Sequence, residues 1–238
     1  MYVVLTVLTA VSFLGVLLAV PESLPKARRQ PGGVAGTLRA ARRMLADRGF
    51  LGYTLAFTFT FAFGALFCYI SASQFVLQNV LGLSVGEASL VFGGGAVIVT
   101  LGSSANAAPA ARVSAAKLLA TGLAGLLVTT AAQAVVTVAG GLTPAVALVT
   151  VAGFSASLGL VFANATALAI GRVPYAAGAA SAVLGTLQHA LAAVVAPLVG
   201  LGGDRDAVAM AVGMVTLAAL ALASLGLTRR SSRDLVTV

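Results

Sequence analysis

The chain has 238 residues, of which 60% are hydrophobic and 8% are charged, whereas an average soluble protein has about 25% charged residues. Fourteen Lys and Arg with six Asp and Glu are too few to cover the surface of a soluble domain of this size. A single cysteine (Cys68) excludes a disulfide framework, and together with a single histidine (His189) it excludes a metal cluster. The composition therefore predicts an integral membrane protein that needs no metal and no cofactor.

The net charge of +8 does not indicate a nucleic-acid partner, although many basic domains bind nucleic acids. The basic residues lie at the ends of long neutral runs, and no basic face with interleaved aromatic side chains occurs. We therefore expect the lipid bilayer, and no nucleic acid, as the partner of these charges.

Seven apolar runs are long enough to cross a bilayer as helices, which takes about 20 largely apolar residues each. One run lies in residues 1–21 and six lie in residues 49–228. The six are found in 49–86, 88–111, 118–171 (two runs), 173–203 and 207–228. A break at Gly140–Pro144 separates the two runs of the longest stretch. The sequence thus predicts an all-α fold with seven transmembrane helices.

The distribution of Lys and Arg predicts the orientation of these helices, because both residues prefer cytoplasmic loops. One assignment of alternate loops places thirteen of the 14 basic residues on the same side. It makes residues 22–48 a basic cytoplasmic loop and residues 229–238 a cytoplasmic tail. Residues 1–21 lack the basic start of a signal peptide, so we expect a retained helix there, with the N-terminus outside.

The loop over residues 22–48 contains a pattern typical of an amphipathic helix. Its apolar residues recur at helical spacing at Val34, Leu38, Ala41 and Leu45. Its basic residues fall on other faces, at Arg39, Arg42 and Arg43. The pattern favours a helix on the inner leaflet, where anionic lipid attracts Lys and Arg. A solvated basic linker is the alternative.

The second predicted span carries neutral polar residues on one face. Ser71, Gln74 and Gln78 follow each other at i, i+3 and i+7, with Phe67 on the same face and Tyr69 near it. Polar groups are expensive inside a membrane and are seldom accidental there. Such a face can line a cavity for amphipathic ligands, or it can hold neighbouring helices together.

The fifth and sixth spans carry the other intramembrane polar residues. A lone Asn164 in the fifth span favours an interhelical hydrogen bond over a ligand contact. In the sixth span, small and polar residues share a face that we expect to be a packing seam: Gly178, Ser181, Gly185 and Gln188. His189, near mid-membrane, is expected to be a neutral hydrogen-bonding residue, with proton coupling as the alternative.

The residue inventory argues against an enzyme. No Asp or Glu lies within a predicted span, so no carboxylate pair is available for acid/base catalysis. No phosphate-binding loop follows a strand, and no lysine lies within a span to hold retinal as a Schiff base.

Four segments are similar to one family, the Bcr/CflA drug:proton antiporters of the major facilitator superfamily. Phe67–Gln78 resembles the seventh helix of that family, Gly159–Ala169 the tenth, Ala177–Gln188 the eleventh, and Pro21–Pro25 the exit of the sixth. Gln74 and Ala163 stand where the family commonly has proline.

The resemblance implies the C-terminal half of a twelve-helix transporter in a bacterial inner membrane. The last six helices (49–228) would form the C-terminal six-helix bundle, and residues 1–21 would correspond to the end of the N-terminal half. A truncated or fragment chain is therefore expected, with the missing half or a second copy as its partner. A stand-alone membrane scaffold and a homodimeric half-transporter are the alternatives.

The resemblance also implies a central cavity for small amphipathic, drug-like substrates. The candidate substrate-binding residues are Tyr69, Ser71, Gln74, Gln78, Asn164, Ser181, Gln188 and His189. Because all six acidic residues lie in predicted loops or tails, we expect no proton-driven transport by this chain alone.

Overall fold

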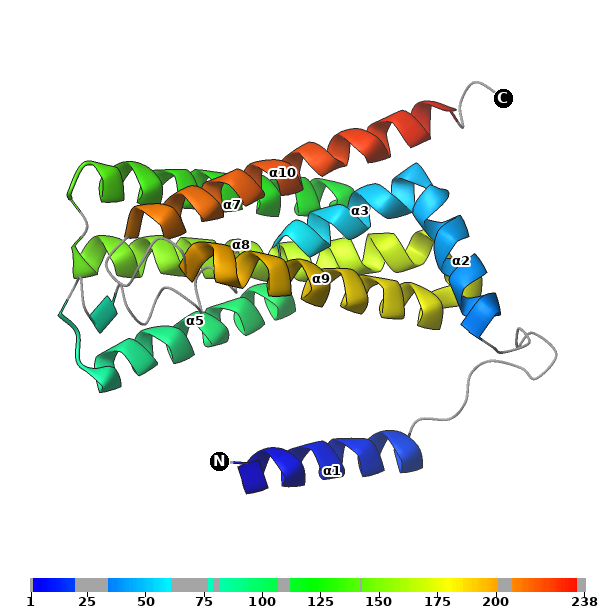
Figure 1. Ribbon diagram of the computed structural model, residues 1–238, viewed down its shortest axis with the longest axis horizontal. Helices are drawn as coiled ribbons and strands as arrows, with labels where there is room; N and C mark the ends of the chain where they lie inside the picture. Colours follow the sequence, from blue (N-terminus) through cyan, green and yellow to red (C-terminus); the bar gives the residue numbers. More distant parts are fainter. Residues whose placement is uncertain are drawn as a thin grey trace. The chain divides into compact units, whose positions relative to one another are not determined.

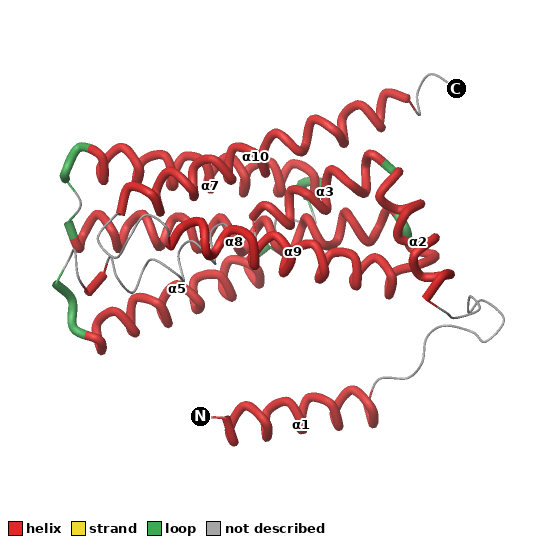
Figure 2. The backbone as a smooth tube through the Cα atoms, viewed as in Figure 1, coloured by secondary structure: helices red, strands yellow, loops and turns green. Residues whose placement is uncertain are grey.

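The structure, a computed structural model, describes residues 2–19, 34–60, 77–78, 82–106, 112–141, 143–200 and 207–234. All regular elements within these ranges are helices (Figures 1 and 2). They are α1 (Tyr2–Ala19), α2 (Val34–Ala46), α3 (Arg48–Phe59), α5 (Val85–Ala105), α7 (Ala115–Val138), α8 (Pro144–Arg172), the 3₁₀ turn η4 (Pro174–Ala176), α9 (Ala177–Gly200) and α10 (Ala207–Asp234).

The all-α membrane architecture predicted from the sequence is confirmed. Within the described ranges, five helical segments are long and apolar enough to cross a membrane, and α1 contains a shorter apolar helix, Thr6–Ala19. The five are Val85–Ala105, Ala115–Val138, Pro144–Arg172, Pro174–Val195 and Ala211–Thr228. The second predicted span begins as α3, and most of its remainder lies outside the described residues.

The chain divides into two compact units, Met1–Leu38 and Arg39–Val238. The first unit contains α1, whose large apolar side chains, such as Leu18, are exposed. Exposed apolar side chains along a whole helix need lipid or another apolar surface around them.

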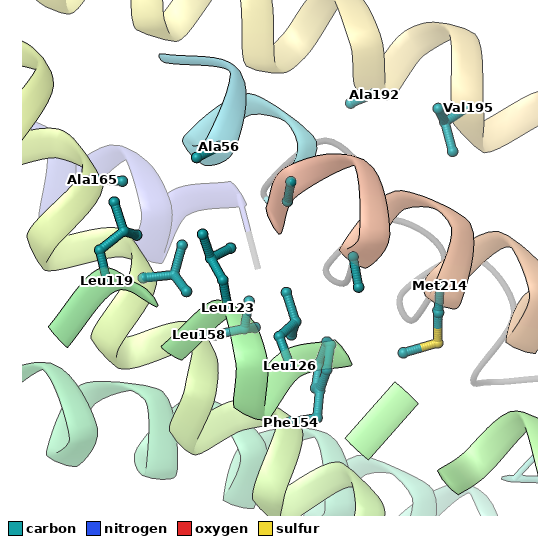
Figure 3. Packing of buried hydrophobic residues seen from close by; sticks show 13 residues of the cluster. Ala56, Leu119, Leu123, Leu126, Phe154, Leu158, Ala165, Ala192, Val195 and Met214 are labelled. Atoms are coloured by element: carbon teal, nitrogen blue, oxygen red, sulfur yellow. The ribbon is translucent and has the colours of Figure 1, made fainter. Parts of the chain in front are cut away.

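The second unit is a bundle in which the long helices run side by side (Figure 1). Its main core draws on five helices and includes Ala56 of α3, Leu123 of α7, Leu158 of α8, Val195 of α9 and Met214 of α10 (Figure 3). This core holds together the same helices that carry the candidate site.

The turn between α7 and α8 follows from its local sequence. Gly140 has a φ of +70°, a left-handed conformation that glycine adopts without a steric penalty. Thr143 then caps α8, because its side-chain oxygen accepts a hydrogen bond from the backbone N–H of Val146 at 3.4 Å. Pro144 occupies the first turn of α8, where its missing N–H costs no helical hydrogen bond. The break predicted at Gly140–Pro144 is confirmed.

Helices α5 and α8 approach each other closely at two glycines. A Cβ atom on Gly159 would lie 2.7 Å from the carbonyl oxygen of Val99 and 2.8 Å from the backbone nitrogen of Ser103, and one on Gly102 would lie 3.2 Å from the carbonyl oxygen of Ala156. The Ser103 hydroxyl donates a hydrogen bond to the carbonyl oxygen of Gly159 at 3.1 Å. Small residues thus allow backbone-to-backbone contact, as is common between membrane helices.

Candidate functional site

Four of the predicted site residues come from the second predicted span. Tyr69, Ser71 and Gln74 lie outside the described residues, so their place in a cavity stays a prediction. Gln78 is half-buried beside the buried Leu77.

Asn164 connects two helices. Its side chain is 3% exposed, and its amide nitrogen donates to the side-chain oxygen of Asn106 at 3.2 Å and to the carbonyl oxygen of Leu160 at 2.8 Å. Asn106 directly follows α5 as its C-cap. Both amide hydrogens of Asn164 are therefore donated to acceptors within the protein. This agrees with the interhelical hydrogen bond that the sequence favoured over a ligand contact. We call the contact of Gly102, Ser103 and Asn106 with Gly159 and Asn164 the α5–α8 seam.

The polar residues of α9 lie in a different environment. Ser181 and His189 are exposed, and Gln188 is half-buried. We call these three residues, together with Gly178 and Gly185, the α9 polar face. The buried residues of the same helix are apolar: Ala180, Leu184, Ala192 and Val195. Gln188 lies on their side of the helix, four residues from Leu184 and from Ala192, and its Oε1 atom is buried.

The packing seam predicted along this face is not found among the described residues. No described atom comes within 4 Å of a Cβ atom placed on Gly178 or Gly185. The helix packs instead through the apolar side, including Leu184 and Val195, because larger apolar side chains gain more from burial than glycines do.

Gln188 and His189 are brought together at the middle of α9. The Nδ1 atom of His189 lies 2.8 Å from the carbonyl oxygen of Gly185 and 3.2 Å from the side-chain nitrogen of Gln188. Because a carbonyl oxygen only accepts, Nδ1 carries the hydrogen in the neutral ring, and Nε2 then carries the lone pair. Gln188 Oε1 is buried without a hydrogen-bond partner, so a flipped amide would direct that oxygen to the Nδ1 hydrogen.

An ion pair that was not predicted from the sequence joins α8 to the start of α3. The Nη2 atom of Arg172 donates to both carboxylate oxygens of Asp47, at 3.3 and 3.2 Å. Asp47 is also the N-cap of α3 and accepts from the backbone N–H of Phe50 at 2.6 Å. The guanidinium lies against Gly49, where a Cβ atom would come within 2.6 Å of it. The sequence signal for this pair was an Arg at the end of one long apolar run and an Asp just before the start of a second apolar run.

The environment of Asp47 favours its charged form. Burial raises the pKa of this carboxyl. The hydrogen bonds from Phe50 and Arg172 and the charge of Arg172 together lower the pKa by more than burial raises it, so the pKa lies below its ordinary value of 3.8. The carboxylate is therefore ionised at neutral pH.

Two buried threonines of α3 were also not predicted from the sequence. Thr54 and Thr58 are buried one helical turn apart, and their hydroxyls have no hydrogen-bond partner in the described part of the chain. The sequence signal for this pair was the spacing of four residues between two threonines near the start of an apolar run, which places both on one face of a helix. Within the same ranges, no three His, Cys, Asp or Glu side chains gather to hold a metal ion.

No protein-family model matches the chain. A search of curated proteins found an uncharacterized transporter of the major facilitator type, YdgK of Bacillus subtilis (strain 168). It is 31% identical over 227 residues, which cover 94% of this chain and 56% of that protein. The chain thus spans about half the length of the curated relative that it matches, which is named as a transporter and not as an enzyme. Together with the multi-pass helical structure, this similarity supports membership of the major facilitator superfamily.

Proposed function

We propose that this chain forms the C-terminal half of a drug:proton antiporter of the Bcr/CflA kind. In the complete transporter the α9 polar face lines a central path for amphipathic substrates. The observation that carries the proposal is the exposure of Ser181 and His189 on a helix that is long and apolar enough to span a membrane.

Exposure of these side chains to lipid would be costly. An exposed polar group that meets lipid in place of water loses its hydration, which costs roughly 2–7 kcal/mol where no hydrogen bond replaces it. His189 lies near the middle of the 24-residue helix α9. A polar path between two transporter halves removes this cost. Transporters with repeated halves bind their substrates near the midplane at the interface between the repeats.

The chemistry of the face favours amphipathic molecules. Ser181, Gln188 and His189 offer neutral hydrogen-bonding groups, and the aromatic second span, with Tyr69, offers stacking surfaces. The chain supplies no carboxylate within a predicted span, so the acidic group for proton coupling comes from the other half.

The orientation follows from the basic residues and is tested by cysteine labelling. In a Cys68→Ser background, Gly141→Cys should react with a membrane-impermeant thiol reagent added to intact cells. Arg39→Cys should react only after the membrane is permeabilised. Labelling of Arg39→Cys in intact cells would reverse the assignment.

Transport itself is tested in proteoliposomes with an imposed pH gradient and a fluorescent amphipathic cation. The chain alone should accumulate none, whereas a fusion with the remaining part of the Bacillus subtilis relative should accumulate it. Ser181→Leu in the fusion should abolish accumulation, and Val194→Leu, at an exposed apolar position of the same helix, should not. Robust accumulation by the chain alone, or none by a correctly assembled fusion, would refute the proposal.

A further inference from the structure

Helix α2 is fixed to the bundle by one of its faces. Met44 is 1% exposed and packs with Ala40 in a second core that also contains Phe50, Ala169 and Leu184. These partners come from the start of α3, the end of α8 and the first half of α9. From Arg39 onward, α2 therefore lies against one end of the bundle (Figure 1).

A second face of α2 is apolar and exposed. Leu38 is 68% exposed and Leu45 is 36% exposed. With about 100° between successive residues, Leu38, Ala41 and Leu45 form one stripe, about a quarter turn from Met44. Because the leucine side chains of this stripe are exposed in the described part of the chain, the stripe needs another apolar environment.

A third face of α2 is basic and exposed. Arg39 and Arg42 lie on the side of the helix away from Met44, and Arg43 lies about a quarter turn from Met44. Arg42 is adjacent to the apolar stripe, and Arg43 is opposite to it. An apolar stripe bordered on one side by Arg42, with Arg39 about a third of a turn from the stripe, is complementary to the boundary between acyl chains and anionic headgroups.

Helix α2 is connected to α3 by a single residue. Asp47 alone separates the end of α2 at Ala46 from the start of α3 at Arg48. Helix α3 continues into the main core through Ala56. A helix of 13 residues is marginal by itself in water, and the contacts of Met44 and Ala40 stabilise it from one face.

We propose that α2 is a lipid-binding helix, in which the Leu38–Leu45 stripe enters the acyl region and Arg39 and Arg42 bind the headgroups of anionic phospholipids. The bundle holds the helix from the side of Met44, so the stripe and the arginines are presented to the leaflet together. This assignment does not depend on what the protein transports.

The chain has no tryptophan, so a single introduced tryptophan reports on its own surroundings. Leu45→Trp and, as a matched control, Ala46→Trp at an exposed position off the stripe are reconstituted in vesicles of phosphatidylglycerol and phosphatidylcholine with brominated acyl chains. We expect a blue-shifted and strongly quenched emission for Leu45→Trp, and a weaker effect for Ala46→Trp. Two unquenched, water-like spectra would show a solvated linker, and a blue shift without quenching would show a protein contact; either result overturns the proposal.

The charge contribution is measured with the same reporter. The ratio of quenching by brominated phosphatidylglycerol to quenching by brominated phosphatidylcholine gives the lipid preference around Leu45→Trp. Arg42→Gln should lower this preference about fivefold, as should Arg39→Gln, because each basic residue near an anionic surface contributes a factor of that order. Arg112→Gln, at an exposed position before α7, should leave it unchanged. An equal loss from Arg112→Gln, or no loss from Arg42→Gln, would refute specific headgroup binding.

Discussion

The α5–α8 seam and the α9 polar face contain the same kinds of residue but differ in the contacts that these residues make. Each combines glycines, a serine and an amide side chain in an apolar helix. In the seam, Gly102 and Gly159 bring two backbones into contact, and Asn164 donates to Asn106. On the α9 polar face, the glycines meet no described neighbour, and Gln188 Oε1 has no partner.

The difference shows that small residues in a membrane helix permit a close approach but do not cause one. The seam is closed because glycines lie on both helices and a hydroxyl and two amides complete its hydrogen bonds. The α9 polar face has no such counterpart in the described part of the chain. Under the proposed function, the polar groups of this face meet the substrate path instead of a neighbouring helix.

The largest expected effect distinguishes the glycines of the two regions. Gly159→Ala forces a Cβ atom against the backbone of Val99 and Ser103, and overpacking of this kind costs about 1–3 kcal/mol. Gly185→Ala, the matched control on α9, meets no atom of the described residues within 4 Å and should be neutral or slightly stabilising. Thermal unfolding of the purified variants in detergent measures both. Equal losses of stability would mean that α9 is as tightly packed as the seam.

A second prediction concerns the amide pair of the seam. Asn164→Ala leaves Asn106 without its donor and should lower the free energy of unfolding by about 1–2 kcal/mol. In a double-mutant cycle with Asn106→Ala, the coupling energy should be about 0.6 kcal/mol or more. Additive losses in the double variant would show that the hydrogen bond contributes no stability. Asn164 would then again be a candidate for a ligand contact.

A third prediction extends the comparison to the end of α8, where Arg172 binds Asp47. Asp47→Ala removes both the helix cap and the ion pair and should cost about 1 kcal/mol. Asp47→Asn keeps a good capping residue and removes only the charge, so it should cost less. Thermal unfolding at neutral pH ranks the two variants, and an equal loss in both would mean that the cap contributes nothing.

The same pair predicts a pH dependence. Because the pKa of Asp47 lies below 3.8 in the folded protein, its ionisation stabilises the fold above that pH, and this contribution is lost as the pH falls below about 4. Asp47→Asn should lack this part of the acid destabilisation. Unfolding curves at neutral and acidic pH test it, and identical acid losses in wild type and Asp47→Asn would contradict it.

The sequence predicted the helices better than their contacts. Apolar run length and the Gly140–Pro144 break are local signals, and they predicted the all-α membrane fold and the turn between α7 and α8. The partner of Asn164 was not predicted, because Asn106 lies 58 residues away, and only packing decides which face of α5 meets α8. The packing seam expected on α9 has no neighbour among the described residues and stays a prediction, since residue size alone does not identify a neighbour.

The smallest expected effect on stability, and the most informative one on function, comes from the α9 polar face. Gln188→Ala removes the amide that lies 3.2 Å from Nδ1 of the neighbouring His189. His189 keeps its contact with the carbonyl oxygen of Gly185, so the free energy of unfolding and the membrane abundance should change by little. In a full-length transporter, however, the same change should alter which amphipathic compounds are exported, because it removes an amide from the proposed path. Export profiles and abundance are measured on the same cells, with Val194→Ala as the matched control at an exposed apolar position. An unchanged export profile with lower abundance would make Gln188 a packing residue and would remove it from the site. A changed profile at equal abundance would identify α9 as the part of this chain that meets the substrate.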